Sequence, residues 1–135
     1  MSITHFTKLI LAELSLVGYF VLMTYEELMC FLAQEGQSEA IQALYIDDPS
    51  VYSAYDNLPV ILAAKNGHLN VLQVLFQYRD VDVNARNSEA FINAARAGHL
   101  DVVEWLLDME PCEHAISTVK SFSLSEEVAE LINAI

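Results

Sequence analysis

Residues 58–69 read LPVILAAKNGHL, and residues 89–100, which follow 31 positions later, read EAFINAARAGHL. Both stretches place two alanines, a glycine and a His-Leu pair at the same offsets. A third, more divergent unit precedes them, because Gly36 stands 31 residues before Gly67. Several independent positions agree in this register, so we interpret the chain as a repeat protein. The aligned positions are Ala33, Ala64 and Ala95; Ile41, Leu72 and Val103; and Leu44, Leu75 and Leu106.

Each unit is predicted to form two short helices. In the second unit Pro59 suits a first helical turn, where its missing N–H costs nothing, and Gly67 permits the positive φ that ends a helix. An apolar face then continues from about Leu69 to Tyr78. The corresponding helices are expected at about 25–35 and 38–45 in the first unit and at 90–97 and 100–109 in the third. Thr24 and Glu27 form a predicted capping box before the first helix.

Two helices this short cannot bury their apolar faces alone, so the units must stack into a continuous core. The sequence therefore predicts an all-α helical repeat solenoid in one domain, residues 1–135. The predicted layout is an apolar helical cap at 1–23, repeats at 24–56, 57–87 and 88–111, and a degenerate capping repeat at 112–135. In the last of these, Ser123 or Ser125 is expected to cap a helix over 126–135.

Residues 58–69, together with VDVNAR at 81–86, resemble an ankyrin repeat, whose family pattern is TPLH-x-AA-x-x-GHL followed by DVNA. The resemblance is closest over 57–109, extends less closely to 24–55, and fades after Glu113. It implies about three and a half ankyrin-like repeats with divergent terminal capping helices. The Thr-Pro-Leu-His tetrad is replaced by LPVI in one unit and EAFI in the next. The fingers of such repeats are the extended stretches between units, here about 47–57, 79–88 and 110–113. A period of 31 residues, rather than the usual 33, predicts that these fingers are shortened.

Composition narrows the function classes. The chain has 135 residues, 54% of them hydrophobic, and a formal net charge of -13. Such an apolar fraction excludes a disordered chain, and four Gly with three Pro are too few for the turns of an all-β fold. A uniformly acidic surface would repel phosphate backbones, so we expect no nucleic-acid partner. Cys30 and Cys112 lie far apart and form no ligand pair, which fits a reducing compartment or two small core residues.

The apolar segment at residues 3–23 leaves three readings open. Lys8 and Glu13 interrupt it, whereas a membrane span needs about 20 predominantly apolar residues, so no membrane span is expected. The segment is expected to be a buried cap, a docking site for a partner, or an element that forms a homo-oligomer. We expect a cytoplasmic or otherwise intracellular protein. An ankyrin-type effector or regulatory protein of an intracellular microbe, secreted into a host cell, is an alternative for which no translocation signal is readable.

The sequence offers no catalytic constellation. It lacks a nucleophile elbow and a Gly-rich phosphate loop, so we predict no enzyme, no cofactor and no metal. His68 and His99 occupy equivalent places and could bind a metal, but a motif histidine that bonds backbone at the inter-helix turn is the favoured interpretation. Tyr45, Tyr52 and Tyr55 either form a recognition patch or cover the core. Trp105 is expected in the core.

The ankyrin resemblance implies a protein partner, bound on the concave face that fingers and first helices build. Carried onto this chain, the predicted partner-binding residues are Tyr55, Asp56, Lys65, Asn66, Arg86, Asn87, Glu89 and Arg96. Three of the six basic residues fall on this face. The carboxylates expected on second helices and finger edges are Asp47, Asp48, Asp80, Asp82, Asp101, Glu104 and Asp108. We therefore expect an acidic or polar partner segment; the alternative is a solvated charged face with no dedicated ligand.

Overall fold

A computed structural model describes residues 24–44 and 49–135. Within these ranges the regular elements are eight α-helices and one 3-10 helix, without strands. The predicted all-α fold is thereby confirmed. The expected N-terminal cap at 1–23 lies outside the described residues, as do Tyr45, Asp47 and Asp48.

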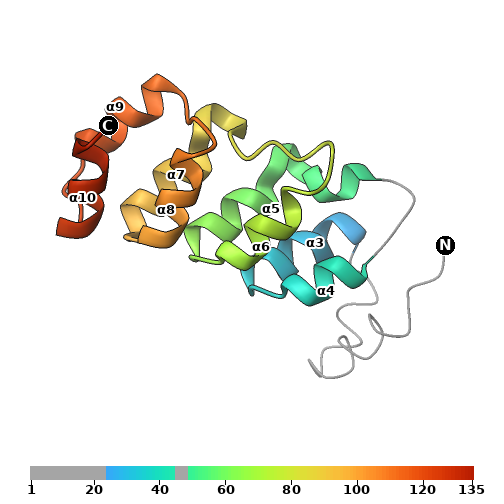
Figure 1. The fold of residues 1–135 in the computed structure, drawn as a ribbon. Helices are drawn as coiled ribbons and strands as arrows, with labels where there is room; N and C mark the ends of the chain where they lie inside the picture. Colours follow the sequence, from blue (N-terminus) through green and yellow to red (C-terminus); the bar gives the residue numbers. More distant parts are fainter. Residues whose placement is uncertain (1–23, 45–48) are drawn as a thin grey trace.

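The helices form four pairs that follow one another along a stack (Figure 1). Each first helix contacts the first helix of the next pair, and each second helix contacts the next second helix. The 3-10 helix η1, Pro49–Ser53, packs against the first helices α3 and α5. The first helices are α3 (Tyr25–Gln34), α5 (Ala54–Lys65), α7 (Ala85–Ala97) and α9 (Glu113–Lys120). The second helices are α4 (Ser38–Ala43), α6 (Leu69–Leu75), α8 (Leu100–Leu107) and α10 (Glu126–Asn133).

The second helices end earlier than their apolar faces predicted. α6 ends at Leu75 rather than near Tyr78, because Gln77 and Tyr78 donate to carbonyls only three residues back, at Val74 and Leu75. Such bonds tighten the last turn beyond the α-helical geometry. α8 likewise ends at Leu107, two residues short of the expected Met109.

The core runs between the two rows of helices. The paired alanines of α5 and α7 are buried to 1% exposure or less, which lets neighbouring first helices approach closely. Leu72 and Leu106 come from second helices and have no exposed surface. Burial of each such side chain contributes about 2 kcal/mol. Stacking therefore builds the continuous core that no single pair could form.

The first helices α5 and α7 each begin with three residues in the left-handed region of φ and ψ. Residues 55–57 and 86–88 all have φ between 53° and 65°, and the two triples stand 31 positions apart. The regular part of α5 begins after Asn57, so Pro59 stands in its first turn as predicted. Seven non-glycine residues of the described chain have positive φ, and six of them belong to these triples.

The repeat histidines bond backbone, as predicted. His68 Nε2 lies 3.0 Å from the carbonyl oxygen of Gln34, and His99 Nε2 lies 3.0 Å from that of Lys65. Both acceptors sit at the end of the preceding first helix. Each imidazole therefore links one unit to the unit before it.

Two local expectations need correction, and a third is confirmed. Ser125 precedes α10 as its N-cap residue, but its side chain makes no cap hydrogen bond. Trp105 is only partly buried, because it packs at the margin of the core beside Phe76 rather than inside it. Thr24 does cap α3, since its Oγ1 accepts from the Glu27 N–H at 3.1 Å.

Candidate partner-binding surface

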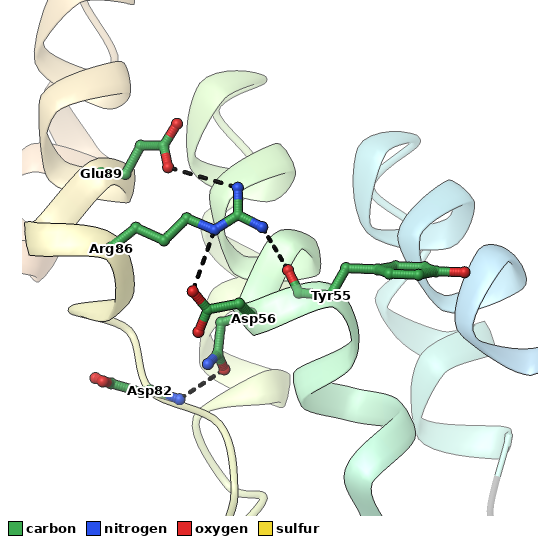
Figure 2. A network of polar contacts seen from close by, with 6 residues as sticks. Tyr55, Asp56, Asp82, Arg86 and Glu89 are labelled. Atoms are coloured by element: carbon green, nitrogen blue, oxygen red, sulfur yellow. Dashed lines mark hydrogen bonds and ion pairs between the residues drawn. The ribbon is translucent and has the colours of Figure 1, made fainter.

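Three of the predicted site residues, Tyr55, Asp56 and Glu89, meet around the guanidinium of a fourth, Arg86 (Figure 2). Its Nη2 donates to the carbonyl oxygen of Tyr55. Its Nε lies 3.5 Å from Asp56 Oδ2, and its Nη1 lies 3.7 Å from Glu89 Oε2. Arg86 therefore ties the start of α7 to the start of α5, and its charge is matched by carboxylates of the same surface.

The left-handed triples hold these residues in place. Asn57, at the end of the first triple, is 7% exposed, and its Oδ1 accepts from the Asp82 N–H at 2.8 Å. Ser88, at the same position of the next unit, is fully buried, and its Oγ accepts from the Cys112 N–H at 2.9 Å. The last residue of each triple thus accepts a hydrogen bond from the backbone of the finger that follows it. Pairing both buried side chains avoids the free-energy cost of an unsatisfied polar group.

Asn57 and Ser88 were not among the predicted site residues. Their signal was present in the sequence, because both are polar and stand in the same repeat register at the start of an apolar helix. They position Tyr55, Asp56, Arg86 and their neighbours rather than presenting polar atoms to a partner. A register comparison of polar positions alone would have found them.

Lys65, Asn66 and Arg96 lie at the other end of the first helices. Lys65 is the last residue of α5 and is exposed. Asn66 Nδ2 donates to the Leu62 carbonyl at 2.8 Å, so this side chain caps its own helix. The Arg96 guanidinium carbon lies 4.8 Å from the centroid of the Phe122 ring, which is cation–π geometry.

The predicted residues therefore form two groups. Tyr55, Asp56, Arg86 and Glu89 gather at the starts of α5 and α7, with Asn87 beside them; its carbonyl accepts from the Cys112 thiol at 3.3 Å. The second group contains Lys65, Asn66 and Arg96. The ion pairs found among the described residues involve Arg86 alone. Lys65 and Arg96, at equivalent ends of neighbouring helices, thus carry positive charge that no described carboxylate neutralises.

The tyrosines divide between core and surface. Tyr52 is 2% exposed, its hydroxyl donates to the Leu44 carbonyl, and its ring stacks on Tyr78 with centroids 3.7 Å apart. Tyr55 is 53% exposed. Tyr52 therefore serves the core, and Tyr55 remains available to a partner.

The two cysteines have different surroundings. Desolvation in the partly buried site on α3, reinforced by the charges of Glu26 and Glu27, raises the pKa of the Cys30 thiol to about 11. The Cys112 thiol instead donates to the Asn87 carbonyl across a unit boundary. Among residues 24–44 and 49–135, no three His, Cys, Asp or Glu side chains come together as a metal site would require.

None of the helices described is long and apolar enough to cross a membrane. A family model for ankyrin repeats (3 copies) matches residues 29–117, well over half of the chain. No curated protein matches the chain. The matched span covers α5, α6, α7 and α8 and both histidine links described above. The chain therefore belongs to the ankyrin repeat family, whose repeats generally mediate protein–protein interaction.

Proposed function

We propose that the chain is a non-enzymatic interaction module that binds an acidic or polar segment of a partner protein along its first helices and fingers. The observation that carries the proposal is the pair of exposed cations Lys65 and Arg96 at equivalent helix ends. They stand on a protein whose formal net charge is -13. Local positive charge on an acidic body selects acidic segments and orients them.

The other predicted residues suit this role in a different way. Arg86 is already held by Asp56 and Glu89, so it acts as a hydrogen-bonding platform rather than as a free cation. Tyr55 offers an exposed aromatic ring beside it. Tyrosine supplies contact area with few rotatable bonds, so little entropy is lost on binding.

The repeat layout supports binding without large rearrangement. In the proposed division into 24–56, 57–87 and 88–111, each unit contributes one first helix to a common surface. Buried alanines and histidine links fix the spacing of these helices before any partner arrives. A surface that is already ordered loses less entropy when it binds.

The test is affinity capture with the chain carrying Lys65→Glu together with Arg96→Glu. This double substitution reverses both unmatched cations, so we expect an acidic partner to lose at least about tenfold in affinity, which is 1.4 kcal/mol. The matched control carries Arg79→Glu with Gln73→Glu and Gln77→Glu. All three residues are exposed, lie on α6 or just after it, outside the predicted surface, and together give the same change in net charge.

Circular dichroism and urea unfolding of the test variant and of the control variant check that the fold survives. The Arg96 substitution also removes the Phe122 contact, so Arg96→Gln is included to separate packing from charge. A partner captured equally by the wild type and by the Lys65→Glu plus Arg96→Glu protein would rule out the proposed surface.

A further inference from the structure

Phe76 and Trp105 form an aromatic pair on the row of second helices, away from the proposed binding surface. Phe76 directly follows α6 and Trp105 lies on α8, so the pair joins two consecutive units. The ring centroids are 5.5 Å apart and the rings are edge to face at 87°. Phe76 is 50% exposed, and Trp105 is partly buried. Half of a large apolar side chain is therefore left in water.

Carboxylates stand near Trp105 in the sequence, on α8 and at its C-cap residue. Asp101 precedes it by four residues and Asp108 follows it by three, so all three share one helix face. Glu104 lies three residues after Asp101, on the same side. All three acidic residues are exposed. The aromatic pair is thus bordered by negative charge.

The whole row of second helices lacks positive charge. The helices α4, α6, α8 and α10 read SEAIQA, LNVLQVL, LDVVEWLL and EEVAELIN, which contain no Lys, Arg or His. The exposed neighbours of Phe76 on α6 and its C-terminal turn are Gln73 and Gln77, which are neutral. The nearest cation along the sequence is Arg79, which lies beyond that turn. Among the helices described, Lys and Arg therefore occur only in the first helices, whereas Asp and Glu occur in both rows.

We propose that Phe76 and Trp105, with Asp101, Glu104 and Asp108, form a second docking surface for a basic partner segment in which lysine or arginine flanks an apolar side chain. The apolar side chain packs against the exposed ring of Phe76. The cations pair with the carboxylates, and one stacks against the electron-rich face of an aromatic ring. Tryptophan is enriched among the residues that contribute most to binding, and the rim around such residues is polar.

Charge complementarity chooses this occupant over the other candidates. A second copy docked through the same surface would bring the same three carboxylates against these, and like charges placed face to face oppose association. Anionic surfaces are repelled for the same reason. A basic segment with an apolar side chain can pair with the carboxylates and also pack against the exposed Phe76 ring. This surface is independent of the proposed function, whose residues lie on the first helices.

The test measures binding of a labelled peptide with capped ends, in which leucines recur at helical spacing and lysines stand between them. Anisotropy of the label gives the affinity. Trp105 is the single tryptophan of the chain, so its fluorescence reports whether the peptide reaches this surface. We expect a blue shift as the peptide excludes water from the ring. A matched peptide with glutamate in place of lysine is expected not to bind.

Two variants locate the site. Phe76→Gln introduces the residue type found at the neighbouring positions 73 and 77. It should lower the affinity for the lysine peptide about tenfold. Asp101→Asn with Glu104→Gln and Asp108→Asn should weaken it at least as much. The control is Glu126→Gln with Glu127→Gln and Glu130→Gln on α10, which changes the net charge equally without touching the aromatic pair, and it should have under a twofold effect.

Four results would overturn the proposal. They are no binding of the lysine peptide, unchanged affinity in Phe76→Gln, an equal loss in the α10 control, and a Trp105 shift that depends on protein concentration without peptide. The last would identify self-association instead. Lys65→Glu with Arg96→Glu should leave peptide binding intact, so failure here and failure of the proposed function are separable.

Discussion

The imidazole of His99 occupies the space that a Cβ on Gly67 would need, with Nδ1 2.6 Å from that position. His68 stands in the same relationship to Gly36, at 2.7 Å. Glycine is therefore required at Gly36 and Gly67 twice over, by the positive φ that ends a first helix and by the histidine of the following unit. The glycine and the histidine that recur in the sequence are thus one contact between units.

Gly67→Ala should be more harmful than Gly98→Ala. Both glycines have positive φ, +76° and +81°, so each alanine costs about 1–2 kcal/mol of backbone strain. At Gly98 the nearest heavy atom is Ser125 Oγ at 3.9 Å, which is ordinary contact. At Gly67 the alanine must also displace His99, which weakens its bond to Lys65 by about a further 1 kcal/mol.

Urea unfolding of the two alanine variants measures the difference. His99→Ala in each background completes the comparison, because removing the imidazole should bring the cost at Gly67 close to that at Gly98. Equal losses for the two single alanine variants would show that backbone strain alone requires glycine.

Ser88→Ala should lower the free energy of unfolding by about 1–3 kcal/mol. The Ser88 side chain is fully buried, and its loss leaves the Cys112 N–H without its 2.9 Å acceptor. Ser123→Ala, at an exposed serine, is the control and should have little effect. Amide hydrogen exchange at Cys112 checks the assignment, since faster exchange is expected in Ser88→Ala, and unchanged exchange would contradict it.

Arg86→Gln should destabilise the protein by only about 1 kcal/mol. Its ion pairs are partly exposed, and such pairs contribute little; the hydrogen bond to the Tyr55 carbonyl supplies the larger share. Added salt should therefore remove less than half of the loss. Arg79→Gln, at an exposed arginine with no ion pair among the described residues, is the control. A loss abolished by salt would show that the ion pairs dominate.

Periodicity predicted the helices and the bonding of the repeat histidines to backbone, because both depend on residues that recur in one register. It did not predict that these bonds reach the preceding unit. It did not predict the left-handed triples at 55–57 and 86–88. No glycine marks them. Positive φ is uncommon for other residues, although Asp56, Asn57 and Asn87 belong to the types in which it is enriched. What stabilises them is the later finger, through Asp82 and Cys112, and that contact exists only after the units stack.

The sequence predicted Arg86 on the proposed partner-binding surface but did not predict that its charge is matched. Asp56 lies 30 positions earlier, in the preceding unit, so only the stacking of units brings the pair together. Trp105 was predicted to be buried in the core but is only partly buried. An apolar helical face predicts burial, but how far the neighbouring unit covers that face depends on where α6 ends, and α6 ends just before Phe76.

Cys30 should react slowly with alkylating agents at neutral pH and faster as the pH rises towards about 11. The thiolate is the reactive form, and desolvation followed by the charges of Glu26 and Glu27 raises the pKa of this thiol from 9.0 to about 11. Between these values the folded protein keeps a proton that the unfolded chain has released. Stability is therefore lost as the pH rises above about 9. The rate of alkylation by iodoacetamide, measured against pH in the Cys112→Ser protein, reads this pKa directly. The same chain in urea should show its rate rising through pH 9.0, and a native rate that levels off at that same pH would contradict the desolvated site.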